Sequence, residues 1–162
     1  MIEGINVPNF RKTLEIMAAE PQLVDMDTWW KSTSCGTTAC LAGHAVTLVG
    51  DFIGGTGSLG LVEVNGRCEA VEYVAGEVLG LNSTVLRNAF FYRPAGLEGR
   101  HAVAVLYQMA ELVTDGEIRM PPEFDADYLE VTAARGGIDP ALDFLSDVPG
   151  FKREAIQKGE VQ

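Results

Sequence analysis

The chain has 162 residues, 47% of them hydrophobic and 22% charged, and its 12 basic and 23 acidic side chains give a formal net charge of −11. This balance is typical of one globular domain with a sizeable core and excludes a disordered chain. No apolar run approaches the roughly 18–20 residues of a membrane-spanning helix. A secretory signal is also absent, so the sequence predicts a cytoplasmic protein without membrane contact. We expect residues 1–162 to form one domain, with 148–162 as a loosely attached C-terminal segment.

The first predicted element is a helix from Pro8 to about Ala19, because proline is favoured in a first helical turn and apolar residues follow at helical spacing. Pro21 marks its end. The tandem Trp29 and Trp30 are too large to remain fully exposed, so we expect them to cover one end of the core.

The next stretch, CGTTACLAGHAV at residues 35–46, contains two of the three cysteines and one of the two histidines. It predicts a helix from about Thr38 to Val49, capped by Thr37 or Thr38 and stopped by Gly50. Apolar side chains surround this helix almost completely, which is typical of a buried central helix. A glycine within it, Gly43, indicates close approach by a neighbouring element.

The following residues predict one hairpin and then three helices. Asn65 and Gly66 lie between two short β-favouring arms and indicate the hairpin turn. The first of these helices is expected at 70–79, ended by Gly80. The second follows a cap at Asn82 or Ser83, and the third spans about 98–114. Residues 115–128 are interpreted as a polar connection before a short helix capped by Asp139, with Pro140 at its first position. The predicted fold is therefore mainly α, a compact multi-helix domain around a buried central helix with one short β-hairpin.

Part of the sequence resembles motifs that occur in other proteins. Trp30, the run CGTTACLAGHA at 35–45 and the segment VAGEVLGL at 74–81 resemble a CGT-x-x-C-x-AGWA element followed by an A-x-x-LGL helix. Both are found in an uncharacterised family of small proteins of actinobacteriophages and their actinobacterial hosts. The resemblance spans residues 8–92 and implies a phage or prophage origin but no activity. Those relatives carry tryptophan where this chain has His44, which implies a packing role for that position.

The cysteine-bearing stretch could in principle bind a metal. Cys40 and His44 are four residues apart and would share a helix face, Cys35 lies just upstream, and Cys68 or His101 could complete a tetrahedral set. However, C-x4-C-x3-H is not a standard zinc spacing, and no C-x2-C pair accompanies it. We therefore expect no metal and no cofactor, with a buried thiol at Cys40 and one hydrogen-bond partner for His44.

Two further motifs suggest catalysis only weakly. Cys35 near a helix start could be a nucleophilic thiolate. However, a thiol nucleophile needs a histidine held by an orienting group, and no histidine elsewhere in the sequence has one. The sequence GTGSLG at 55–60 matches G-x-G-x-x-G, yet it follows a predicted helix and precedes a hairpin strand, which is the wrong context for a phosphate loop. The sequence therefore favours a non-enzymatic protein.

Two binding functions remain open, and the sequence indicates no oligomeric state for either. The segment from Glu111 to Asp147 contains ten acidic residues and two arginines, so it carries a charge of −8. Such a surface repels nucleic acid but could bind a basic host protein, including as a nucleic-acid mimic, or simply aid solubility. Its candidate contact residues are Glu117, Glu123, Asp125 and Asp127. Alternatively, an arginine–aromatic cluster could sequester a small anionic ligand such as a nucleotide, through Arg87, Arg93, Arg100 and Tyr92.

Overall fold

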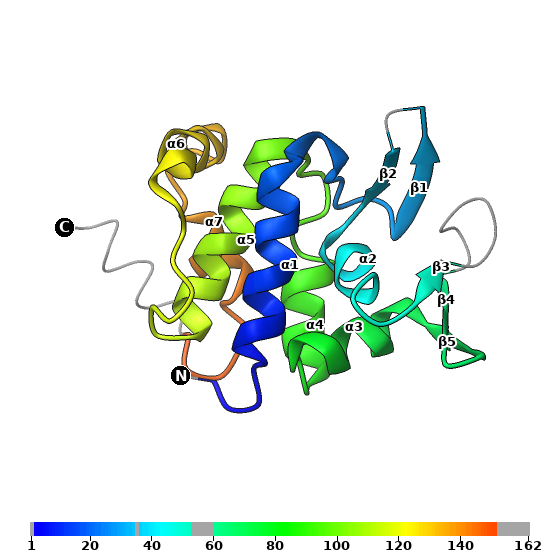
Figure 1. Ribbon diagram of the computed structural model, residues 1–162. Helices are drawn as coiled ribbons and strands as arrows, with labels where there is room; N and C mark the ends of the chain where they lie inside the picture. The colour runs from blue at the N-terminus through cyan, green and yellow to red at the C-terminus, as the bar shows by residue number, and fades with distance from the viewer. Residues whose placement is uncertain (1, 35, 53–59, 152–162) are drawn as a thin grey trace.

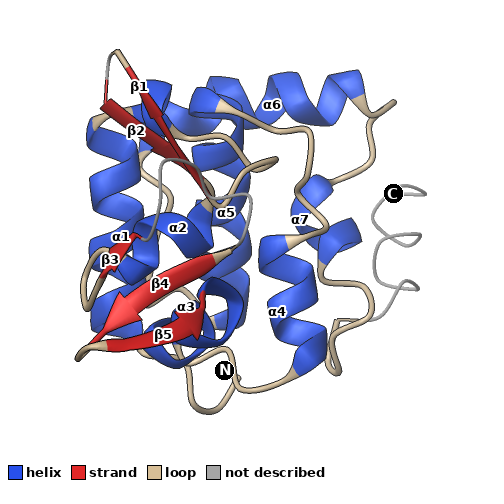
Figure 2. Cartoon of the chain, turned by 90° about the vertical axis from the view of Figure 1, so that its right-hand side faces the viewer, coloured by secondary structure: helices blue, strands red, loops and turns tan. Residues whose placement is uncertain are grey.

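The computed structural model describes residues 2–34, 36–52 and 60–151. This part of the chain contains seven α-helices and two small antiparallel sheets. The helices pack together around a shared core (Figure 1), and the two sheets lie side by side on one flank of them (Figure 2). The predicted mainly α-helical fold is confirmed. One sheet contains the predicted hairpin and a third strand, and the other is an additional hairpin.

Helices α1 (Val7–Ala19) and α5 (Gly99–Val113) run side by side through the middle of the fold (Figure 1). The predicted ranges of both are confirmed. The side chain of Asn6 accepts a hydrogen bond from the Asn9 N–H at 3.0 Å and so caps α1. From α1, the fully buried side chains that enter the core are Phe10, Leu14 and Met17.

The additional hairpin corrects the predicted start of the central helix. Residues Gly36–Ala39 form strand β2, which pairs with β1 (Trp30–Thr33). Thr37 and Thr38 therefore lie in a strand rather than capping a helix. The β-branched threonines suit a pleated strand, and β1 supplies the hydrogen bonds that a sequence window cannot reveal.

Helix α2 is short, Leu41–Val46, and all six of its residues are buried, so a buried central helix is confirmed. It begins after Cys40 and ends before the predicted limit of Val49. The close approach predicted at Gly43 is also present. A Cβ atom there would lie 1.8 Å from the carbonyl oxygen of Trp29, so the chain preceding β1 crosses directly over this glycine.

The second sheet consists of β3 (Asp51–Phe52), β4 (Leu61–Val64) and β5 (Arg67–Ala70), in the order β3-β4-β5. Asn65 and Gly66 form the predicted turn, with φ values of 51° and 76°, which suit a two-residue hairpin. Most of the glycine-rich motif at 55–60 lies outside the described residues. The elements that flank it are β3 and β4, so no helix N-terminus follows it.

Two predicted helices follow as α3 (Val71–Leu79) and α4 (Thr84–Phe91). Gly80 ends α3 in the left-handed conformation, with φ 75°. Ser83 caps α4 because its hydroxyl accepts a hydrogen bond from the Leu86 N–H at 3.1 Å. Local capping signals thus placed both helix boundaries correctly.

In the C-terminal part the prediction of a polar connection at 115–128 is wrong, because a helix begins within it. A 3-10 turn, η3 (Pro122–Phe124), leads into helix α6 (Asp125–Ala134), which crosses one end of α5. Only Val131 of α6 is fully buried, so the helix lacks a clear apolar stripe, and its position depends on contacts with α5. The predicted cap at Asp139 is confirmed, since it begins α7 (Pro140–Phe144). Residues 152–162 of the expected loose tail lie outside the described part.

Candidate functional site

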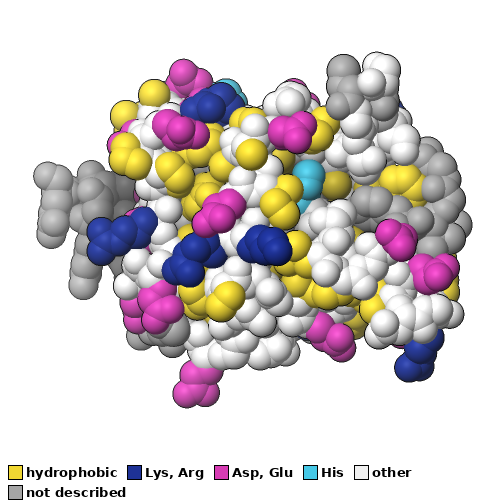
Figure 3. Space-filling model, in the orientation of Figure 1, with side chains coloured by type: hydrophobic (Ala, Val, Ile, Leu, Met, Phe, Trp, Pro, Cys, Tyr) yellow, Lys and Arg dark blue, Asp and Glu magenta, His cyan; other side chains and the backbone are white. Residues whose placement is uncertain are grey.

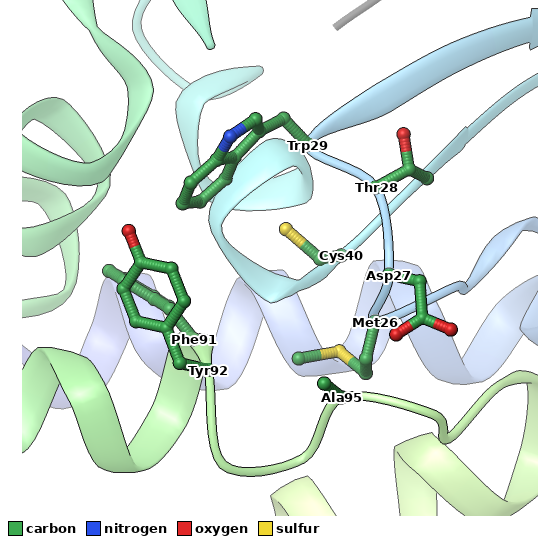
Figure 4. Close-up of a pocket in the computed structure, with 8 residues that line it drawn as sticks. All are labelled: Met26, Asp27, Thr28, Trp29, Cys40, Phe91, Tyr92 and Ala95. Carbon is green, nitrogen blue, oxygen red and sulfur yellow. The ribbon is translucent and has the colours of Figure 1, made fainter. Parts of the chain in front are cut away.

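A small pocket opens where the loop before β1, the start of α2 and the end of α4 meet (Figure 4). Its volume is about 220 Å³. The lining residues are Met26, Asp27, Thr28, Trp29, Cys40, Phe91, Tyr92 and Ala95. Residues more than 50 positions apart in the chain thus converge on one concave surface, as is usual for small-ligand sites.

The deepest part of the pocket is apolar. The side chains of Met26, Cys40 and Phe91 are 4%, 2% and 3% exposed and form its floor. Trp29 and Tyr92 are more exposed and form an aromatic wall, with their ring centroids 5.8 Å apart at an interplanar angle of 87°. This edge-to-face contact closes one side of the pocket and leaves aromatic surface facing it.

The polar groups of the pocket are mostly engaged. The Thr28 hydroxyl donates to the carbonyl of Trp30 at 3.2 Å, and the Tyr92 hydroxyl donates to Glu72 at 2.8 Å. Burial and this bond to a carboxylate raise the pKa of Tyr92 to about 12, so it remains a donor. Asp27 accepts from the Gly96 N–H at 2.7 Å through one oxygen. Among the described residues it is the one charged member of the lining, and no described cation pairs with it.

Cys40 and His44 have packing environments rather than reactive ones. Burial raises the pKa of the Cys40 thiol to about 11. His44 Nε2 lies 2.9 Å from the carbonyl oxygen of Leu23, and because a carbonyl only accepts, this nitrogen carries the proton. Burial lowers the pKa of His44, which keeps the ring neutral at physiological pH. The metal set considered from sequence is not assembled by the described residues: Cys68 is exposed on β5 and Cys35 lies outside them.

The three candidate arginines do not form one pocket. Each pairs with a different carboxylate: Arg87 with Glu72 at 3.7 Å, Arg93 with Asp147 at 2.8 Å and Arg100 with Asp127 at 3.1 Å. Only Tyr92 of the predicted arginine–aromatic group lines the pocket. The surplus of acidic groups explains this separation, since each of the three arginines finds a carboxylate in a different part of the fold.

The predicted acidic surface is partly neutralised. Asp127 is held by Arg100, whereas Glu117, Glu123 and Asp125 are exposed and have no ion-pair partner among the described residues. On the face shown in Figure 3 the acidic side chains are spread over the surface rather than gathered in one cluster. Glu123 in η3 and Asp125 at the start of α6 carry part of the remaining charge.

A group that sequence reasoning did not assemble lies where α5 meets α6. Ligand atoms of His101, Asp127 and Glu130 all lie within 4.8 Å of one another. The His101 ring nitrogen is 2.7 Å from the Glu130 carboxylate, and Arg100 contacts Asp127. An arginine at this distance competes with a cation for Asp127, so the group is an ion-pair network on the surface.

Comparisons with protein-family models, curated proteins and solved structures gave no match to this chain. Among the helices of the described residues, none combines the length and apolar character needed to cross a membrane. The pocket is the feature that sequence reasoning missed. Its signals were present in the tandem Trp29–Trp30 and in Phe91 and Tyr92, but nothing local indicated that they meet at Cys40.

Proposed function

We propose that this protein is a phage or prophage accessory protein that acts in the host cytoplasm by binding a basic host protein. The resemblance at residues 35–45 supports the origin. One observation supports the mode of action: Glu117, Glu123 and Asp125 are solvent-exposed carboxylates without ion-pair partners among the described residues. Arg11 and Arg100 donate to the backbone carbonyl oxygens of Glu117 and Glu123 at 2.7 Å and 2.9 Å, not to the carboxylates, which stay available.

The first turn of α6 combines this charge with an apolar contact. Leu129 is 66% exposed, and it lies four residues after Asp125, so the two side chains are neighbours on one helix face. An exposed apolar side chain bordered by charge is a common arrangement at protein interfaces. A partner with lysines or arginines around an apolar recess would complement this surface, and long-range attraction would speed association.

Sequestration of a small anion is less well supported. Arg87, Arg93 and Arg100 would each have to leave a carboxylate, and they point to different neighbours. Three ion pairs would have to break before these arginines could form one site for an anion, and breaking them would cost free energy and weaken binding. The binding of a basic protein requires no such rearrangement.

The test compares retention of proteins from an actinobacterial host lysate on three immobilised forms of the full chain. The first is the wild type. The second carries Glu117→Gln, Glu123→Gln and Asp125→Asn. The third carries Glu3→Gln, Glu63→Gln and Glu77→Gln, which changes the charge equally at exposed positions elsewhere. A specific partner is then identified and its affinity for each form is measured at several salt concentrations.

We expect the first triple variant to weaken binding roughly three- to tenfold or more, because each exposed ion pair contributes about 0.2–1 kcal/mol. The control variant should bind like the wild type, and salt should weaken the binding of both of these forms. Thermal unfolding of each form shows whether loss of Asp125, which favours the start of α6, affects folding. Equal effects of the two variants, or binding that salt leaves unchanged, would contradict the proposal.

A further inference from the structure

We propose that the pocket between Trp29, Cys40 and Tyr92 binds a small organic ammonium ion that carries an aromatic or aliphatic group. This inference depends on different residues from those of the acidic surface, so either can fail without the other. It rests on the shape of the pocket, the chemistry of its lining and the sign of its charge.

The shape suits a compact ligand. A dry cavity of about 150 Å³ accommodates a benzene ring, and this pocket has a volume of about 220 Å³. The additional space fits a short alkyl chain with an ammonium group. The floor of Met26, Cys40 and Phe91 would contact the apolar part of such a ligand.

The lining favours a cation over an anion. Trp29 and Tyr92 present aromatic rings, whose faces attract cations. Asp27 supplies the one charge that the described residues bring to the lining, and its second carboxylate oxygen is not used by the bond to Gly96. The nearby Glu72 is shared between Tyr92 and Arg87, so it adds little net charge. No basic residue of the described part of the chain lines the pocket, and the net charge of −11 repels anions from the whole molecule.

The thiol in the floor would not react with the ligand. Cys40 is 2% exposed, and its raised pKa keeps the sulfur protonated at physiological pH. In Figure 4 its sulfur lies among the aromatic rings and Met26, where it acts as a small polarizable surface. The site is therefore one for reversible binding.

Three probes of one skeleton test the proposal with the full chain: 2-phenylethylammonium, neutral 2-phenylethanol and anionic phenylacetate. Calorimetry gives the affinities, and NMR of the tryptophan indole protons locates the site. Asp27→Asn removes the charge but keeps an oxygen that can accept from Gly96. Asp51→Asn is the matched control, because Asp51 is exposed on β3, outside the pocket lining. Ala95→Leu places extra atoms at the pocket wall.

We expect the ammonium probe to bind about three- to tenfold more tightly than the alcohol, with phenylacetate weakest. Asp27→Asn should remove most of this preference while changing alcohol binding less than about twofold, and Asp51→Asn should change neither. Ala95→Leu should weaken all three probes, with circular dichroism showing that the fold is retained. The proposal is overturned if no probe binds with a Kd below about 10 mM. It is also overturned if charge makes no difference, if the two aspartate variants behave alike, or if Ala95→Leu has no effect.

Discussion

Cys40 is the residue that decides whether the cysteine-bearing stretch reacts or packs. It lies between β2 and α2, its side chain is 2% exposed, and its backbone N–H donates to the carbonyl of Thr28 at 2.9 Å. The pKa of its thiol rises from 9.0 to about 11 because burial disfavours the charged thiolate. A helix N-terminus normally lowers the pKa of a cysteine. Here desolvation is the larger effect.

This shift predicts a pH dependence of stability. Between pH 9 and about 11 the unfolded chain has lost the thiol proton while the folded protein retains it, so the free energy of unfolding falls as the pH rises. From pH 8 to pH 10 the wild type should lose about 1 kcal/mol more than Cys40→Ala. Urea denaturation of both proteins at pH 8, 9 and 10 measures this difference, since all the other ionisable groups are common to both. Parallel curves would show that Cys40 is not desolvated.

Among the elements, α6 and α7 are joined by side chains of Tyr128 and of Arg135, whose guanidinium pairs with Asp143. The Tyr128 hydroxyl of α6 donates to Asp139 at 2.5 Å and accepts from the Ala141 N–H at 3.2 Å. Asp139 also accepts from the Leu142 N–H and so caps α7. Burial and the neighbouring carboxylate raise the pKa of Tyr128, which keeps its hydroxyl protonated. The position of α7 therefore depends on a tyrosine in another helix.

Tyr128→Phe should lower the free energy of unfolding by about 1–2 kcal/mol, because it removes a donor to a charged group and leaves the Ala141 N–H without this acceptor. Tyr73→Phe is the matched control, since Tyr73 is 62% exposed and its hydroxyl has no hydrogen bond among the described residues. Chemical denaturation of both variants gives the comparison. If the two substitutions cost the same, the bridge between the helices contributes nothing.

At the scale of the whole molecule, the excess of negative charge opposes folding. A net charge of −11 concentrates like charges when the chain becomes compact, and several exposed carboxylates have no counter-charge among the described residues. Salt at about 0.5 M shortens the range of this repulsion to a few ångströms. Surface ion pairs such as Arg93–Asp147 are weakened too, but they contribute little individually.

We therefore expect the midpoint of thermal unfolding to rise by several degrees between about 10 mM and 500 mM salt at pH 7, given that about 1 kcal/mol shifts the midpoint by roughly 2–8 °C. Sodium chloride and potassium chloride should act equally, which separates screening from binding of one particular ion. Scanning calorimetry measures the midpoint. A midpoint that falls with salt would mean that ion pairs outweigh the repulsion.

The sequence by itself determined the elements whose signals are local. A proline in the first turn of α1, Ser83 before α4, Gly80 after α3 and the Asn65–Gly66 turn each act on backbone groups only a few residues away. Their effect is therefore visible in a short window. The burial of α2 was also predictable, because nearly every side of that helix is apolar.

Only the tertiary structure decided the features that depend on distant partners. Thr37 and Thr38 form a strand because β1 pairs with them, and α6 forms although its own apolar pattern is weak, because it packs on α5. The pocket needed Trp29, Cys40 and Tyr92 to meet, and the three arginines pair with carboxylates in other elements or loops. Backbone pairing, side-chain packing and ion pairing act through space, so the spacing of residues along the chain cannot specify them.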